Sequence, residues 1–168
     1  MKNSQGFPPI AKSNATILIL GSMPGQVSLD RHQYYAHPRN SFWSIIFDLL
    51  NADSELNYEQ RKQLLYDNNI AVWDVLKSCY RRGSLDADID PATIEANDFK
   101  SFFKKHPNIK YIYFNGTKAE QIFNKKVLEN LAPESVFKYH RLPSTSPAHA
   151  AITRQQKLLE WSVIKKVL

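Results

Sequence analysis

Cysteine is almost absent from this sequence, which contains a single one, Cys79, in 168 residues. One cysteine excludes an intramolecular disulfide and a four-cysteine zinc or iron–sulfur centre. Nothing in its neighbourhood marks a reactive thiolate, so we interpret Cys79 as a half-buried small apolar residue. His37 has no second histidine at ligand spacing, and the sequence therefore implies neither a metal nor an organic cofactor.

Long apolar runs and phosphate-binding glycine motifs are also missing. No run approaches the roughly 20 residues that span a bilayer, and residues 1–10 lack the apolar core of a signal peptide. We therefore expect no membrane partner. We also expect a monomer in the cytoplasm, associated with the nucleoid if the source is prokaryotic. A small nucleotide-binding hydrolase is disfavoured because neither Gly-x-Gly-x-x-Gly nor a Walker lysine is present.

The composition is that of one folded domain with a basic surface. Hydrophobic residues make up 43% and aromatic residues 12% of the chain, which argues against disorder. The length predicts a single domain over residues 1–168, with residues 1–14 as an N-terminal arm. The net charge of +6 favours a polyanionic partner such as nucleic acid, without identifying one.

Apolar runs alternate with segments of helical periodicity along the chain. The predicted strands are 16–20, 70–73, 109–114 and 136–142, and the predicted helices are 42–50, 58–66, 97–105, 117–131 and 154–167. This alternation predicts an α/β fold, with a central four-stranded, mainly parallel sheet in a three-layer α/β/α arrangement. Residues 74–96 are polar and irregular, and we interpret most of them as a surface excursion with a solvated acidic loop.

The most informative stretch follows the first predicted strand. Residues 21–25, GSMPG, form a tight turn, and residues 34–43 then bring together aromatic, basic and amide side chains. In open α/β sheets, ligands bind beyond the carboxyl ends of the strands, so these residues are expected to form a pocket. Asn40 can orient a water molecule with its amide, and it is equally suited to cap the following helix.

This stretch resembles the uracil-DNA glycosylase superfamily at residues 35–43, YAHPRNSFW. Relatives specific for mismatched uracil or thymine carry asparagine in the preceding turn, where this chain has Met23. The resemblance is instead to the hypoxanthine-DNA glycosylase branch, whose catalytic asparagine lies at the position of Asn40. Residues 73–79 with 81–86 resemble the second segment of that branch, and residues 142–150 resemble its final motif.

The resemblance implies a monofunctional glycosylase that flips a deaminated base out of DNA and excises it with water. Hypoxanthine from deoxyinosine is the expected base. Excision of uracil or xanthine, and binding of damaged DNA without chemistry, remain open alternatives. Asn40 is the expected catalytic residue. The expected base-binding residues are Tyr35, Ser22, Met23, Asp74 and Asn115, and the expected DNA-binding residues are Ser144, Thr145, Ser146, Pro147 and His149.

Three of these residues carry specific chemical expectations. Tyr35 can stack on an extruded base, or it can be a packed aromatic residue as we expect for Tyr34. Asp74, as a carboxylate, can accept a hydrogen bond from N1–H of hypoxanthine, or it can cap a helix or belong to a buried pair. Asn115 offers a donor and an acceptor at the same sheet edge, although Asn-Gly is also a turn signal.

Overall fold

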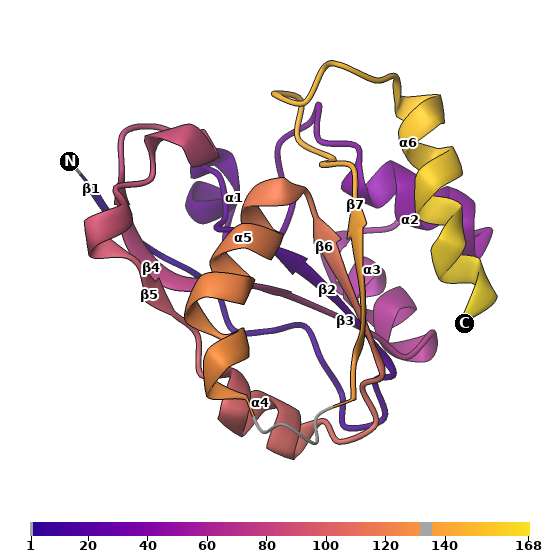
Figure 1. The fold of residues 1–168 in the computed structure, drawn as a ribbon. Helices are drawn as coiled ribbons and strands as arrows, with labels where there is room; N and C mark the ends of the chain where they lie inside the picture. The colour runs from indigo at the N-terminus through magenta and orange to yellow at the C-terminus, as the bar shows by residue number, and fades with distance from the viewer. Residues whose placement is uncertain (1, 132–135) are drawn as a thin grey trace.

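A four-stranded parallel sheet forms the centre of the molecule in a computed structural model, which describes residues 2–131 and 136–168 (Figure 1). Its strands lie in the order β3-β2-β6-β7, and every neighbouring pair is parallel. The strands are β2 (Ile17–Gly21), β3 (Ile70–Asp74), β6 (Tyr111–Asn115) and β7 (Lys138–Leu142). β2 and β3 are buried along their whole length, as expected for continuous apolar runs in a sheet covered on both faces.

Helices cover both faces of this sheet, which confirms the predicted three-layer α/β/α fold (Figure 1). One face carries α2 (Phe42–Leu50), α3 (Tyr58–Asp67) and α6 (Arg154–Trp161), and the other carries α4 (Phe99–Lys105) and α5 (Thr117–Lys126). Each layer is joined by aromatic packing. The Phe42 and Trp161 rings meet edge-on with centroids 5.9 Å apart, and Phe99 meets Phe123 at 5.2 Å on the other side.

The predicted helix boundaries are accurate to a few residues, except at two C-termini. The helix expected over 117–131 ends at Lys126 and continues as the 3-10 turn η3 (Leu128–Asn130). The helix expected over 154–167 ends at Trp161, followed by the 3-10 helix η4 (Ser162–Lys166). The strand expected from Val136 starts at Lys138, and residues 132–135 lie outside the described residues.

A second, antiparallel sheet corrects two expectations. The N-terminal arm begins with β1 (Lys2–Gln5), and the expected surface excursion contains β4 (Leu76–Arg81) and β5 (Glu95–Ala96), in the order β1-β4-β5. These strands could not be predicted from the sequence, because β4 mixes polar and apolar residues whose exposure does not alternate regularly. Cys79 lies on β4 and is 1% exposed, so it is a core residue, more deeply buried than the half-buried position expected from the sequence.

Two short elements lie above the carboxyl edge of the main sheet and were not predicted. Helix α1 (Gln26–Arg31) follows the turn after β2, and the 3-10 turn η1 (Asp86–Asp88) follows β4. The backbone N–H of Gln26, at the start of α1, donates to the hydroxyl of Ser84, which precedes η1 in the chain, at 2.9 Å. A further 3-10 turn, η2 (Pro91–Thr93), leads to β5. Over the described ranges, no helix has the length and apolar character needed to cross a membrane.

Candidate active site

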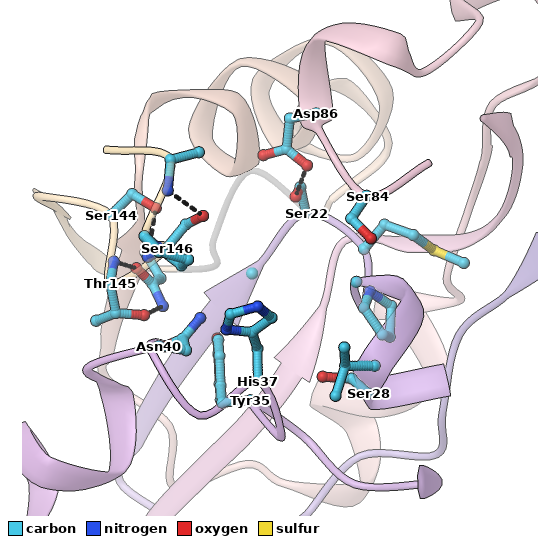
Figure 2. A pocket seen from close by; sticks show the side chains of 18 of the residues that line it. Ser22, Ser28, Tyr35, His37, Asn40, Ser84, Asp86, Ser144, Thr145 and Ser146 are labelled. Atoms are coloured by element: carbon cyan, nitrogen blue, oxygen red, sulfur yellow. Dashed lines mark hydrogen bonds between the residues drawn. The ribbon is translucent and has the colours of Figure 1, made fainter. Parts of the chain in front are cut away.

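A cavity of 540 Å³ opens at the carboxyl edge of the main sheet (Figure 2). Along the chain, β2 is followed by a neighbour on one side, β3, and then by a neighbour on the other side, β6. Such a reversal of strand order leaves a crevice, which is where open α/β sheets bind ligands. The cavity is lined by Asp74, Asn115 and parts of the segments 21–28, 34–40, 84–86 and 144–148.

The structure brings nearly all the predicted site residues to this one cavity. The residues that line it are Ser22, Met23, Tyr35, Asn40, Asp74, Asn115, Ser144, Thr145, Ser146 and Pro147. His149 does not line it. It lies instead in a neighbouring hollow of 320 Å³ with Arg141 and Glu160, next to Ser144, which borders both. The volume of the main cavity is within the range typical of sites for small organic groups.

Asn40 caps the following helix and also lines the cavity. Its Oδ1 accepts a hydrogen bond from the backbone N–H of Phe42 at 3.0 Å, which caps the first turn of α2. The N-cap position itself is Ser41, whose side chain makes no capping bond. Because the oxygen must face the Phe42 N–H donor, the Nδ2 group turns toward the cavity (Figure 2). The His37 ring fixes this loop by accepting the Arg39 N–H at 3.1 Å.

Tyr35 is held in an unusual conformation above the end of β2. Its φ is +56°, a left-handed value that costs an aromatic residue free energy and is retained only where surrounding contacts enforce it. The ring stacks on Phe42 with centroids 3.9 Å apart, so one face is already covered and only the other can meet a base. Tyr34 is buried and bonds the Pro8 carbonyl at 3.0 Å, which confirms its packing role.

Thr145 is the point at which three segments of the site are joined. The Asn115 amide donates to the Thr145 hydroxyl and accepts the Thr145 N–H, both at 2.9 Å. The Thr145 carbonyl in turn accepts the Ser41 N–H at 3.0 Å. Thr145 is only 1% exposed, so its side chain orders the loop from within. The neighbouring Ser144 and Ser146 are only partly buried.

The loop around Thr145 presents two hydroxyl groups in tight serine turns. Ser144 Oγ accepts the Ser146 N–H and Ser146 Oγ accepts the Ala148 N–H, each at 3.2 Å, which leaves both O–H groups able to donate to phosphate. From below, Lys157 of α6 donates to the Ser146 carbonyl at 3.3 Å. Lys157 is 5% exposed, and this burial lowers the pKa of its amine.

Asp74 ends β3 at the bottom of the cavity and is 3% exposed. It pairs in register with Gly21, where a Cβ would lie 2.4 Å from Asp74 Oδ1 and 3.1 Å from the Tyr35 hydroxyl. Asp74 Oδ2 and the Tyr35 hydroxyl are both buried without a hydrogen-bond partner among the described residues. Burial, and then the charge of Asp86, raise the pKa of Asp74 to about 8, against a smaller lowering by Arg81.

Asp86 is a cavity residue that the sequence interpretation missed. It was assigned to a solvated acidic loop, but its Oδ1 accepts the Ser22 hydroxyl at 2.6 Å across the mouth of the cavity (Figure 2). Burial raises the pKa of Asp86, while Ser22, Arg81 and Lys118 act in the opposite direction. The resemblance of segment 81–86 to a known motif was the signal that could have identified it.

Metal ligation finds no support in the part of the chain that the structure describes, where no three His, Cys, Asp or Glu side chains are grouped suitably. The polar side chains that line the cavity carry amide, hydroxyl and carboxyl groups, together with the His37 imidazole and the Arg39 guanidinium. Amides and hydroxyls can orient water and phosphate, and carboxyls can exchange protons with a bound heterocycle.

Comparison with known proteins gives consistent results. The model of the uracil DNA glycosylase superfamily matches residues 8–165. A hypoxanthine DNA glycosylase of Methanosarcina barkeri is 43% identical over 116 residues, covering 68% of this chain and 72% of the relative. A hypoxanthine DNA glycosylase of Methanosarcina acetivorans is 33% identical over 161 residues, covering 95% and 96%. A solution NMR structure of a Methanosarcina acetivorans protein assigned as a uracil DNA glycosylase aligns with a TM-score of 0.82 at 31% identity, covering 99% of this chain and 98% of that one.

Proposed function

The chain belongs to the uracil DNA glycosylase superfamily, and on that premise we propose that it excises hypoxanthine from DNA containing deoxyinosine. The observation that carries the proposal is the convergence of Asn40, Asp74 and the loop 144–147 on one cavity. An amide, a buried carboxyl and phosphate-binding hydroxyls are the groups needed to hold an extruded nucleotide and to attack its sugar. The names of the two Methanosarcina relatives support hypoxanthine as the base.

The loop 144–147 supplies the grip on the DNA strand in this proposal. Extrusion of a nucleotide costs a few kcal/mol of stacking and pairing, which contacts to the flanking phosphates must offset. The hydroxyls of Ser144 and Ser146 point from a loop that Thr145 and Lys157 fix from inside. A loop ordered before binding loses little conformational entropy when it takes up a phosphate.

Asn40 positions the attacking water in this proposal. The Phe42 N–H holds the amide plane, so the Nδ2 group and the second lone pair of Oδ1 have fixed directions at the cavity. An amide is too weak a base to remove a proton from water. Its contribution is therefore orientation of the water toward the sugar carbon as positive charge develops there.

Base release from defined duplexes tests this function. Duplexes with one deoxyinosine, deoxyuridine or deoxyxanthosine are incubated with the protein, and abasic sites are detected by alkaline cleavage. We expect release mainly from deoxyinosine and, for a monofunctional enzyme, no strand cleavage before alkali. Absence of abasic product from all three would refute the glycosylase assignment, and preferential release from another duplex would change the substrate.

Replacing the amide of Asn40 tests its catalytic role. We expect Asn40→Ala to lower the single-turnover rate about 100- to 1,000-fold, the effect of removing one preorganised polar group, with DNA affinity retained. The matched control is Asn108→Ala, which removes an exposed asparagine at the opposite end of the sheet. A rate for Asn40→Ala equal to that of the control would remove Asn40 from the mechanism.

A further inference from the structure

Two carboxyl groups enter the cavity from different elements and in different surroundings. Asp86, on η1, accepts the Ser22 hydroxyl and lies in the field of the cations Arg81 and Lys118. Asp74, at the end of β3, is more deeply buried, and its Oδ2 has no donor within the described ranges. Surroundings this different move the pKa values of two carboxyls apart, so that one is charged and the other neutral at the same pH.

We propose that Asp74 is a neutral carboxylic acid that donates its proton to the extruded base as the glycosidic bond breaks, and that Asp86 is the ionised partner that keeps this proton on Asp74. This inference rests on the proposed glycosylase function and adds the leaving-group chemistry of the same site. Asp74 would then act as a donor, in contrast to the acceptor role expected from the sequence.

The geometry around Asp74 favours the neutral form. A buried carboxylate is stabilised by two or three donors, and Asp74 Oδ2 has none among the described residues. The Tyr35 hydroxyl converges with Asp74 Oδ1 over Gly21, and Tyr34 is nearby. Both are neutral groups that offer no compensating charge.

Arg81, the cation that lowers the pKa of Asp74, makes no hydrogen bond with it among the described contacts. Arg81 of β4 is 3% exposed; its Nη2 donates to the Pro24 carbonyl under the turn after β2, and its Nε and Nη1 are buried without a partner among the described residues. Its effect on the pKa of Asp74 is smaller than those of burial and of Asp86, which together raise that pKa to about 8. Asp74 therefore carries its proton at neutral pH, where a free aspartate has lost it.

The proton transfer accounts for every atom of the reaction. The bond between the sugar carbon C1′ and the base nitrogen N9 breaks, and its electron pair stays with the base. The Asp74 proton moves to a lone pair of the base, so that hypoxanthine leaves as a neutral molecule. Water held at Asn40 supplies hydroxide to C1′, and its remaining proton passes to solvent. The Asp74 carboxylate then takes up a proton again.

The pH dependence of single-turnover excision separates this role from a structural one. For the wild type we expect a constant rate up to about pH 8 and a decline above it, as Asp74 loses its proton. Asp86→Asn removes the neighbouring charge while its carbonyl can still accept the Ser22 hydroxyl, so the decline should start roughly one pH unit lower. Asp74→Asn should be about 100-fold slower at pH 7 and show no such decline.

Asp88→Asn is the matched control, because Asp88 lies on the same 3-10 turn but is exposed and outside the cavity. Its pH profile should match that of the wild type. A decline that stays in place in Asp86→Asn overturns the coupling of the two carboxyls. A wild-type rate and pH profile in Asp74→Asn overturns the donor role.

Carbon-13 NMR titration of the Asp74 carboxyl in the free protein provides a readout that needs no catalysis. We expect it to titrate near pH 8 in the wild type and at lower pH in Asp86→Asn. Titration near pH 4, the ordinary value for aspartate, would overturn the inference even in an active enzyme. Failure of the wild type to release any base would instead refute the proposed function itself.

Discussion

Substitution of Gly21 by alanine tests whether Asp74 and Tyr35 can take their positions at the bottom of the cavity only because residue 21 has no side chain. The added Cβ would lie 2.4 Å from Asp74 Oδ1 and 3.1 Å from the Tyr35 hydroxyl, and real Cβ atoms do not approach other atoms as closely as the first of these distances. Asp74 is 3% exposed, so the carboxyl, the Tyr35 ring or the strand itself must shift to accommodate the methyl group.

The size of the effect follows from this overpacking. An extra methyl group in a packed interior costs about 1–3 kcal/mol. For a chain of this length each kcal/mol lowers the melting temperature by about 2–4 °C, so we expect Gly21→Ala to melt about 2–12 °C lower. Because the displaced atoms belong to the proposed proton donor and its neighbour, we also expect base excision to slow at least about tenfold.

Gly25→Ala in the same turn is the matched control. A Cβ at Gly25 would lie 3.8 Å from the Ser84 side chain, an ordinary contact, and we expect stability within about 0.5 kcal/mol of the wild type. Melting temperatures come from calorimetry and rates from single-turnover excision of deoxyinosine. Equal stability and equal activity of the two variants would refute the assignment of Gly21 as the glycine that makes room for Asp74.

Three further predictions concern buried groups of the cavity. Thr145→Val leaves the Asn115 amide without its acceptor, so we expect a loss of about 1–3 kcal/mol in urea unfolding and weaker DNA binding. Tyr35→Phe removes an unpartnered buried hydroxyl but keeps the Phe42 stack, so unfolding should show equal or greater stability. The folded protein binds the Asp74 proton more tightly than the unfolded chain does. The contribution of Asp74 to the free energy of unfolding therefore decreases as the pH rises from about 4 to about 8. Asp74→Asn should therefore be more stable than the wild type at pH 8, by at least about 1.4 kcal/mol in urea unfolding, and should show less pH dependence; equal pH profiles would contradict this.

The main sheet was predictable because its strands can be recognised from short stretches of the sequence alone. The segment 17–20 is a continuous apolar run, and in a parallel sheet such a run has one plausible environment, burial on both faces. The topology then explains why three site residues meet. Asp74 and Asn115 are the last residues of β3 and β6, and Asn40 lies in the connection from β2 to α2. Resemblance to known motifs added their expected roles.

The small sheet and the wall with Asp86 were not predictable by the same means. β4 has polar residues on its exposed face and no continuous apolar run, and its partners β1 and β5 are too short to show a period. The pKa of Asp74 was equally out of reach, because it depends first on burial in the folded protein and then on the positions of Asp86 and Arg81. Sequence patterns report local environment, whereas this pair of carboxyls is a product of tertiary structure.

The pairing of β1 with β4 determines how firmly the cavity is closed. Asn3 pairs with Tyr80 and Gln5 with Ser78, so this sheet joins segments that are far apart along the chain, and η1 with Asp86 extends directly from it. A short, polar, long-range pairing opens at lower free energy than a buried parallel core. We therefore expect amide hydrogens of β1 and β4 to exchange before those of β2 and β6. The cavity can then lose its Asp86 wall, and with it the charge that holds the Asp74 proton, while the main sheet stays folded.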